Sequence, residues 1–221
     1  MLVSNIIYRH PAVLAKHAIT VDQLSGGRLD IGVGAGVYST DRAMAGVPQW
    51  PAGERVDRLE EFVQAINLAL RGQASFEGRY YRFDAARVVP GSIQRPRPPI
   101  LIGAAGPRLL RLTARHADGW SAFGGIDVAD EDAFLAALRR QTIAIDRYCD
   151  EIGRDRRSLR RLLLAFRPLR PWRSADALSM LSEQAHALAF DEIIVYKPAD
   201  DDERRAFDAA VTDTLPALRS L

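Results

Sequence analysis

Short apolar runs alternate with longer amphipathic segments along the whole chain. A run of alternating or β-branched apolar residues predicts a strand, and apolar residues three and four apart predict a helix. The predicted strands are 2–8, 28–34, 100–103, 119–123, 161–166 and 192–196, with a small hairpin at 75–83. The first three predicted helices span 12–24, 54–71 and 107–117, and Leu14, Ala18 and Val21 form the apolar face of the first. A fourth runs from a cap at Asp130 to Ile152, and a fifth from a cap at Ser174 to Leu188. The last predicted helix carries Phe207, Val211 and Leu218.

Strands that alternate with helices of this length predict an α/β fold with a parallel sheet. The runs at 161–166 and 192–196 are almost continuously apolar, which is typical of strands covered on both faces. The alternation is compatible with a doubly wound open sheet or with a closed barrel. No linker or internal repeat interrupts it, so we expect one domain over residues 1–221. Six strand–helix units use up the 221 residues, whereas an eight-stranded barrel typically takes about 250.

Composition sets limits on the class of protein. Hydrophobic residues make up 48% and charged residues 26% of the chain, which predicts a folded core, and the net charge of +2 gives no reason to expect nucleic-acid binding. Cys149 is the only cysteine and is expected to be a buried helix residue, which suits a reducing cytoplasm. We see no basic leader at the N-terminus and no apolar run of membrane-spanning length, so we expect a cytoplasmic protein without a membrane partner.

Two glycine-rich loops follow predicted strands. The first is GVGAG, which contains Gly34, Ala35 and Gly36; it differs from the dinucleotide fingerprint because no helix opens directly after it. The second contains Gly103, Ala104, Ala105 and Gly106, and Pro107 then opens a helix. Small residues expose backbone amides, and a helix N-terminus favours an anion, so we expect a phosphate there. The structural alternative for each loop is tight local packing.

Other polar residues are candidates for chemistry. His10 lies where a strand gives way to a helix, and Asp41 lies in the loop after the first glycine segment, where a solvated loop acid is the alternative. Arg167, Arg170 and Arg173 follow one strand end and would grip an anionic ligand or form a solvated basic loop. No histidine pair has metal-ligand spacing beside a carboxylate, so we expect no metal.

Several segments in this order resemble the luciferase-like monooxygenases. They are YRHPAVLAK (8–16), DQLSGGRLDIGVGAG (22–36), GERV (53–56) with LEE (59–61), FEGRYY (76–81), QRPRPPILIG (94–103) and ARHADGW (114–120). The resemblance implies a (β/α)₈ TIM-barrel type fold that is incomplete at the N-terminus, with about the last six of eight strands. It also implies a cofactor at the barrel mouth, held by the two glycine loops and by Leu2 and Val3, where the family often has a strand bulge.

The residues of these motifs are more similar to those of the branch that uses coenzyme F420 than to those of the branch that uses FMN. The implied reaction is hydride transfer between coenzyme F420 and a small organic substrate. An FMN-dependent monooxygenase using O₂ is the first alternative, and a non-catalytic remnant that binds only cofactor or a partner is the second. The family's catalytic groups on its first strands have no counterpart here, so the catalytic residues stay unknown, with His10 and Asp41 as candidates. Open strand edges invite oligomerisation, with a homodimer among the expectations.

Overall fold

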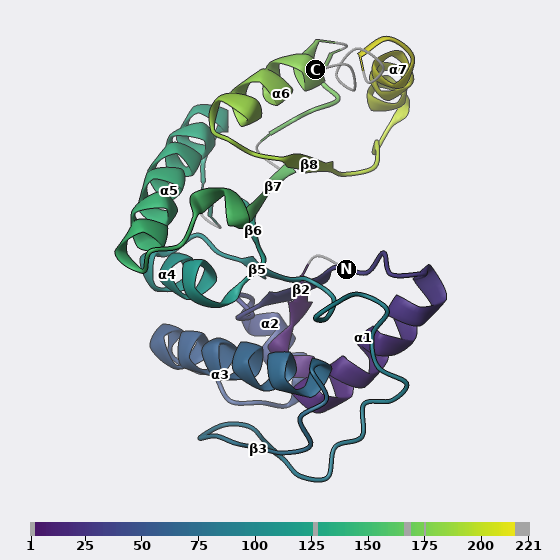
Figure 1. Ribbon diagram of the computed structural model, residues 1–221. Helices are drawn as coiled ribbons and strands as arrows, with labels where there is room; N and C mark the ends of the chain where they lie inside the picture. Colours follow the sequence, from purple (N-terminus) through teal and green to yellow (C-terminus); the bar gives the residue numbers. More distant parts are fainter. Residues whose placement is uncertain (1–2, 126–127, 166–168, 175, 215–221) are drawn as a thin grey trace. The chain divides into compact units, whose positions relative to one another are not determined.

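The structure, a computed structural model, describes residues 3–125, 128–165, 169–174 and 176–214 (Figure 1). The main-sheet strands are β1 (Ser4–Asn5), β2 (Ile31–Gly34), β5 (Ile100–Gly103), β6 (Gly119–Ala122), β7 (Arg160–Ala165) and β8 (Glu192–Val195), and the hairpin is β3 (Phe76–Glu77) and β4 (Arg82–Phe83). The α-helices are α1 (Pro11–Ser25), α2 (Ser39–Ala45), α3 (Ala52–Leu70), α4 (Pro107–His116), α5 (Glu131–Glu151), α6 (Ala177–Ala187) and α7 (Asp201–Ala209). Shorter helical turns are η1 (Ile6–Tyr8), η2 (Arg156–Ser158) and the π-helical η3 (Ala210–Thr214).

The strand order β1-β2-β5-β6-β7-β8 follows the order of the chain. A doubly wound open sheet reverses its strand order at a switch point, so the sequential order decides for the barrel-type alternative. The pairs β1–β2, β2–β5 and β7–β8 are all parallel. The α/β class and the small hairpin predicted from the sequence are therefore confirmed.

The chain divides into two compact units, which we describe separately. One comprises Met1–Ala104 with Arg108–Trp120, and the other Ala105–Pro107 with Ser121–Leu221. In the first, α1 packs against α3, and the core includes fully buried Phe62 and Ile66 of α3 and Ile102 of β5. The second has a core cluster of Trp172, Leu178 and Ala210. The expectation of a single domain stays a prediction.

Cys149 is a buried residue of α5 and Asp130 caps this helix, as the sequence predicts. Cys149 is fully buried, and burial raises the pKa of its thiol. The Asp130 carboxylate accepts a hydrogen bond from the Ala133 amide at 2.8 Å and caps the helix. Both observations confirm the predicted helix, which ends at Glu151, close to the predicted boundary.

The expectation of a strand over 2–8 is wrong beyond Asn5. The Asn5 side chain accepts a hydrogen bond from the Ile7 amide at 3.1 Å, and the chain turns into η1. Such a local bond from an asparagine side chain competes with strand pairing. The helix face predicted for 12–24 is also corrected, because Ala15, Ala18 and Ile19 are buried while Val21 is 47% exposed.

Three further expectations at the elements' edges need correction. Ser174 does not cap α6 with its side chain; its carbonyl accepts from the Ala177 amide, and the helix begins after Asp176. Strand β8 has one exposed residue and three half-buried ones, so it is not covered on both faces. The loop expected after β2 contains a short helix, α2. Leu218 lies outside the described residues.

Candidate functional site

The carboxyl ends of β1, β2 and β5 form one edge of the parallel sheet. The register pairs Asn5 with Gly34 across β1 and β2, and Val33 with Ile102 across β2 and β5. Because the strands are parallel, Gly34 and Gly103 both lie at this edge. Ligands of parallel α/β folds bind at the carboxyl ends of their strands, so this edge is where we place the candidate site.

Gly34 and Gly103 make room for the side chain of Val3. A Cβ atom on Gly34 would lie 2.7 Å from Val3 Cγ2, and one on Gly103 would lie 3.3 Å from Val3 Cγ1. Val3 is 37% exposed, so it presents an apolar surface beside both glycines. All three residues were predicted from the sequence to bind the cofactor, and they lie together in the structure. Leu2, named with them, lies outside the described residues.

Gly36 is held in a conformation that requires glycine. Its φ is +69°, and a Cβ atom there would lie 2.5 Å from Asn5 Oδ1 and 2.7 Å from Ile7 Cδ1. The backbone after β2 therefore packs directly against the residues that follow β1. Ala35 between the glycines is buried. The glycine segment thus serves local packing, which was the structural alternative, and also positions the exposed chain from Val37 onward.

Asn5 brings Asp41 to the end of β1. Its side-chain amide donates to Asp41 Oδ2 at 2.9 Å, while its Oδ1 accepts from the Ile7 amide. The Tyr8 hydroxyl donates to the Asp41 carbonyl at 3.4 Å. Partial loss of hydration and the charge of Asp41 raise the pKa of the Tyr8 hydroxyl. Asp41 was a sequence candidate, whereas Asn5 and Tyr8 were not; the signal for Asn5 was a lone polar residue at a strand end.

Two arginines converge on the carbonyl of Gly36. Arg42 Nη1 donates to this oxygen at 3.1 Å and Arg55 Nη1 at 2.8 Å. Arg42 is 6% exposed and also donates from Nε to Gln49 Oε1 at 2.7 Å. Burial, and then the charge of Arg42, lower the pKa of Arg55. Sequence inspection missed this pair, since the two residues belong to different helices.

The loop from Gly103 to Gly106 joins β5 to α4. The Trp120 indole donates to the Ala104 carbonyl at 2.8 Å and fixes the buried start of the loop. Within the described residues the amides of Ala105 and Gly106 form no hydrogen bond, and a Cβ on Gly106 would meet nothing within 4 Å. Two open amides at the start of a helix suit a phosphate oxygen, so the loop fits the phosphate of a flavin-type cofactor.

His10 has structural partners on both ring nitrogens. Nδ1 accepts from the Ala12 amide at 3.4 Å and caps α1, and Nε2 lies 3.1 Å from the Arg82 carbonyl. The ring also meets Tyr81 edge-on, with centroids 6.1 Å apart. These contacts tie the start of α1 to the hairpin, and nothing in them brings His10 to the candidate site.

The basic loop after β7 is partly neutralised. Both terminal nitrogens of Arg173 bond the Glu131 carboxylate, so the charge of Arg173 has a partner. Arg170 is exposed, and Arg167 lies outside the described residues. The solvated-loop alternative fits Arg170 and Arg173 better than an anion clamp does.

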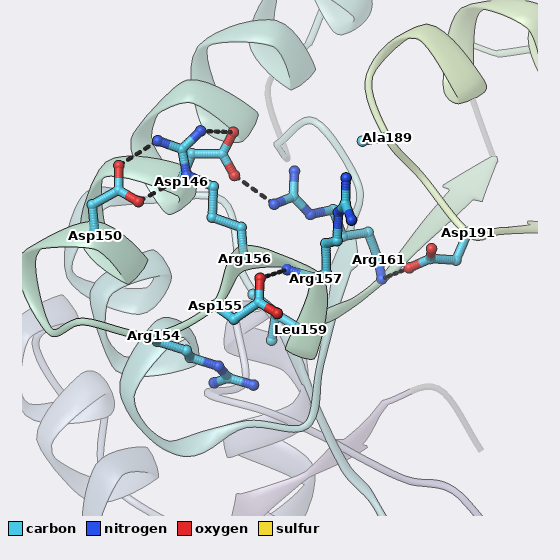
Figure 2. A pocket seen from close by; sticks show the side chains of 10 residues that line it. All are labelled: Asp146, Asp150, Arg154, Asp155, Arg156, Arg157, Leu159, Arg161, Ala189 and Asp191. Atoms are coloured by element: carbon cyan, nitrogen blue, oxygen red, sulfur yellow. Dashed lines mark hydrogen bonds and ion pairs between the residues drawn. The ribbon is translucent and has the colours of Figure 1, made fainter.

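A pocket of about 730 Å³ lies at the amino ends of β7 and β8 (Figure 2). It is lined by Asp146, Asp150, Arg154, Asp155, Arg156, Arg157, Leu159, Arg161, Ala189 and Asp191. Asp146 pairs with Arg161 and, at 3.6 Å, with Arg156, while Asp150 pairs with Arg156. The hydrogen bond from Arg156 lowers the pKa of Asp150. These charges largely satisfy one another at the amino ends of strands, so we assign the pocket a structural role.

Over the described part of the chain, no group of three or more His, Cys, Asp or Glu side chains has the arrangement of a metal site. Over the same residues, no helix combines the length and apolar character needed to cross a bilayer.

Comparison with known proteins identifies the family. The model of the luciferase-like monooxygenases matches residues 2–209. The chain belongs to this family. The coenzyme F420-dependent tetrahydromethanopterin reductase of Methanopyrus kandleri, a solved structure, superimposes with a TM-score of 0.77 at 17% identity, over 97% of this chain and 81% of that chain. At this identity the likeness shows the fold alone, and it confirms the luciferase-like TIM-barrel type for the partial barrel.

Curated relatives of this luciferase-like chain use two cofactors. The F420-dependent glucose-6-phosphate dehydrogenase of Nakamurella multipartita is 37% identical over 148 residues, which cover 65% of this chain and 42% of that protein. The FMNH₂-dependent dimethylsulfone monooxygenase of Pseudomonas putida is 32% identical over 135 residues, covering 61% and 37%. The chain therefore matches less than half the length of each. Dependence on coenzyme F420 and dependence on FMNH₂ both occur among these relatives.

Proposed function

We propose that the chain belongs to an oxidoreductase that transfers a hydride between coenzyme F420 and a small organic substrate. The observation that carries the cofactor-binding part of the proposal is the pair of open amides at Ala105 and Gly106, which follow a parallel strand and open a helix. The relative from Nakamurella multipartita supports the choice of coenzyme F420. The sequence of the motifs in residues 8–120 is more similar to the F420-dependent branch, and this similarity also supports the choice of coenzyme F420.

The residues at the strand ends would bind different parts of the cofactor. Ala105 and Gly106 would hold the cofactor's phosphate through their amides. The Trp120 indole donates a hydrogen bond to the carbonyl of the preceding residue, Ala104. Gly34 to Gly36 and Val3 would lie along the cofactor, with Val3 supplying apolar contact. When bound, the deazaflavin supplies the carbon that accepts or gives up the hydride, and the protein supplies orientation and a dry surface.

Asp41 is the group we propose to move a proton. Asn5 occupies Oδ2 of its carboxylate, which fixes the orientation of the group. No hydrogen bond to Asp41 Oδ1 is formed within the described residues, so this atom can accept a proton from a substrate hydroxyl or return it. An alcohol oxidised by hydride transfer loses a proton as well, so a base at this edge completes the reaction.

An FMN-dependent monooxygenase that uses O₂ is the second candidate. The specific observation in its favour is the 32% identity to the FMNH₂-dependent enzyme of Pseudomonas putida. The phosphate loop serves either cofactor, since both carry a phosphate. The two functions therefore differ in which cofactor binds at the loop, coenzyme F420 or FMN, and in whether the reaction consumes oxygen.

A turnover screen tests the proposal. The full chain is mixed with coenzyme F420 and a panel of alcohols and sugar phosphates, and the bleaching of the cofactor's absorbance is followed without oxygen. We expect bleaching with at least one substrate class. Oxygen consumption with reduced FMN, and no bleaching in any F420 reaction, would assign the chain to the second function.

A further inference from the structure

The Gly36 carbonyl accepts hydrogen bonds from two cationic side chains. Arg42, from α2, and Arg55, from α3, place their Nη1 atoms 3.1 and 2.8 Å from the same oxygen. Two guanidinium groups that share one acceptor repel each other. The two lone pairs of the carbonyl oxygen accommodate both donors, but a neutral carbonyl offsets neither positive charge.

Neither arginine has a carboxylate partner among the described residues. The acid beside Arg42 in the sequence, Asp41, is bonded to Asn5. The acid beside Arg55, Glu54, pairs with Arg58 at 2.7 Å. Neither of these carboxylates forms an ion pair with Arg42 or Arg55 in the part of the chain that the structure describes.

Burial makes this imbalance costly. Arg42 is more than nine-tenths buried, and Arg55 Nε is buried without any hydrogen-bond partner. An unpaired buried cation and an unsatisfied buried donor each cost free energy. Arg55 also sits in the first turns of α3, where the helix dipole adds positive potential. Charge, open donors and dipole all favour an anion with several acceptor oxygens.

We propose that Arg42 and Arg55 form a binding site for an oxyanion, a carboxylate or a phosphate, beside the loop that follows β2. Arginine forks match the planar or tetrahedral oxygens of such groups. The same chemistry occurs on an acidic substrate and on the anionic tail of the cofactor. The inference rests on the proposed function only for which molecule carries the oxyanion; binding of the free ion does not depend on it.

Inorganic phosphate is the probe for the site itself. The full chain is titrated with phosphate, and with chloride at matched ionic strength, while the unfolding temperature and the phosphorus NMR linewidth are followed. We expect saturable stabilisation and broadening with phosphate alone. Equal responses to phosphate and chloride would overturn the inference before any variant is made.

Variants separate this site from the open amides at Ala105 and Gly106 and from a merely structural role. Arg55→Gln and Arg42→Gln should each weaken phosphate binding by about tenfold or more, because a charged partner is lost. Arg55→Lys keeps the charge and should lose less. Arg139→Gln, which removes an exposed arginine from α5, is the matched control and should not change the affinity. If the Arg55 and Arg42 variants only lower the unfolding temperature and leave phosphate affinity intact, the site does not exist.

A last comparison identifies the molecule that carries the oxyanion. Parallel losses of phosphate and coenzyme F420 affinity in Arg55→Gln would assign it to the cofactor. An unchanged F420 affinity with a raised KM for an acidic substrate would assign it to the substrate. Phosphate binding by a wild-type chain that binds no F420 would refute the proposed function and leave this site standing. Binding of coenzyme F420 by a wild-type chain that does not bind phosphate would refute only this site.

Discussion

Asn5 and Asp41 are joined by a hydrogen bond of 2.9 Å that ties the end of β1 to the first turn of α2. It fixes one oxygen of a half-buried carboxylate at the edge of the sheet where the glycine segments also end. The same asparagine turns the chain into η1 through its other atom, Oδ1. One side chain thus ends a strand and orients the acid that we propose as the proton carrier.

Replacing Asp41 separates the two roles of its carboxylate. Asp41→Asn keeps an acceptor oxygen for Asn5 and should leave the free energy of unfolding nearly unchanged, whereas Asp41→Ala should lower it by about 1 kcal/mol. Both variants lose the proton acceptor, so both should slow hydride transfer at saturating coenzyme F420. Urea unfolding and single-turnover kinetics provide the two measurements. Full turnover in Asp41→Asn would remove Asp41 from the reaction.

Gly36 and Gly46 form a matched pair for testing the packing of the glycine loop. Both have positive φ, +69° and +68°, but a Cβ on Gly36 would meet Asn5 whereas one on Gly46 would meet nothing within 4 Å. Gly46→Ala should therefore cost about 1 kcal/mol, from backbone strain alone. Gly36→Ala adds a steric overlap and should cost roughly 2–4 kcal/mol in thermal unfolding. Equal costs would show that Asn5 does not pack against this loop.

Gly106→Ala tests the open amides at the start of α4. The φ of Gly106 is not positive and space is free around its Cβ position, so the protein should fold with unchanged or slightly raised stability. The added methyl group would crowd an oxyanion on the Ala105 and Gly106 amides. We expect several-fold weaker binding of coenzyme F420 in a fluorescence titration. An affinity equal to that of the wild type would place the cofactor's phosphate elsewhere.

Tyr81 gives a prediction for the dependence of stability on pH. Burial raises its pKa from the ordinary value of 10.0 to about 12; Arg58 opposes the shift and Glu61 adds to it. The neutral hydroxyl is favoured in the folded state, so its contribution is complete below pH 10 and is lost as the pH rises toward 12. After allowance for partial solvent exposure, the contribution is on the order of 1–2 kcal/mol.

The Tyr81→Phe variant isolates this contribution from other alkaline titrations. The difference in free energy of unfolding between the wild type and the variant should shift in the variant's favour between pH 10 and 12. Urea unfolding at several pH values gives that difference. A difference that is constant across this range would mean that Tyr81 ionises as easily in the folded chain as in the unfolded one.

The order of the strands and helices was predictable because glycines and helix caps mark where these elements begin and end. The GVGAG segment ends β2 and Asp130 caps α5, and both features are local in sequence. Helix α2 escaped prediction since its seven residues carry no apolar stripe. The extent of β1 was overestimated, because one Asn5 hydrogen bond outweighs the strand preference of the β-branched residues that follow.

The candidate site was only partly predictable from the sequence. The two glycine loops and Asp41 stand out by composition and by position after strands. The convergence of Arg42 and Arg55 on one carbonyl depends on how two helices pack, which no local pattern encodes. His10 shows the opposite error, since a histidine at a strand-to-helix junction fits a site and a helix cap equally well.

The proposed function requires that the chain bind a deazaflavin in preference to FMN. The most direct measurement is a pair of anaerobic titrations of the full chain, one following the quenching of coenzyme F420 fluorescence and one following the binding of reduced FMN. We expect saturable quenching by the chain and a lower dissociation constant for coenzyme F420 than for reduced FMN. Saturable binding of reduced FMN without any quenching of F420 fluorescence would contradict it.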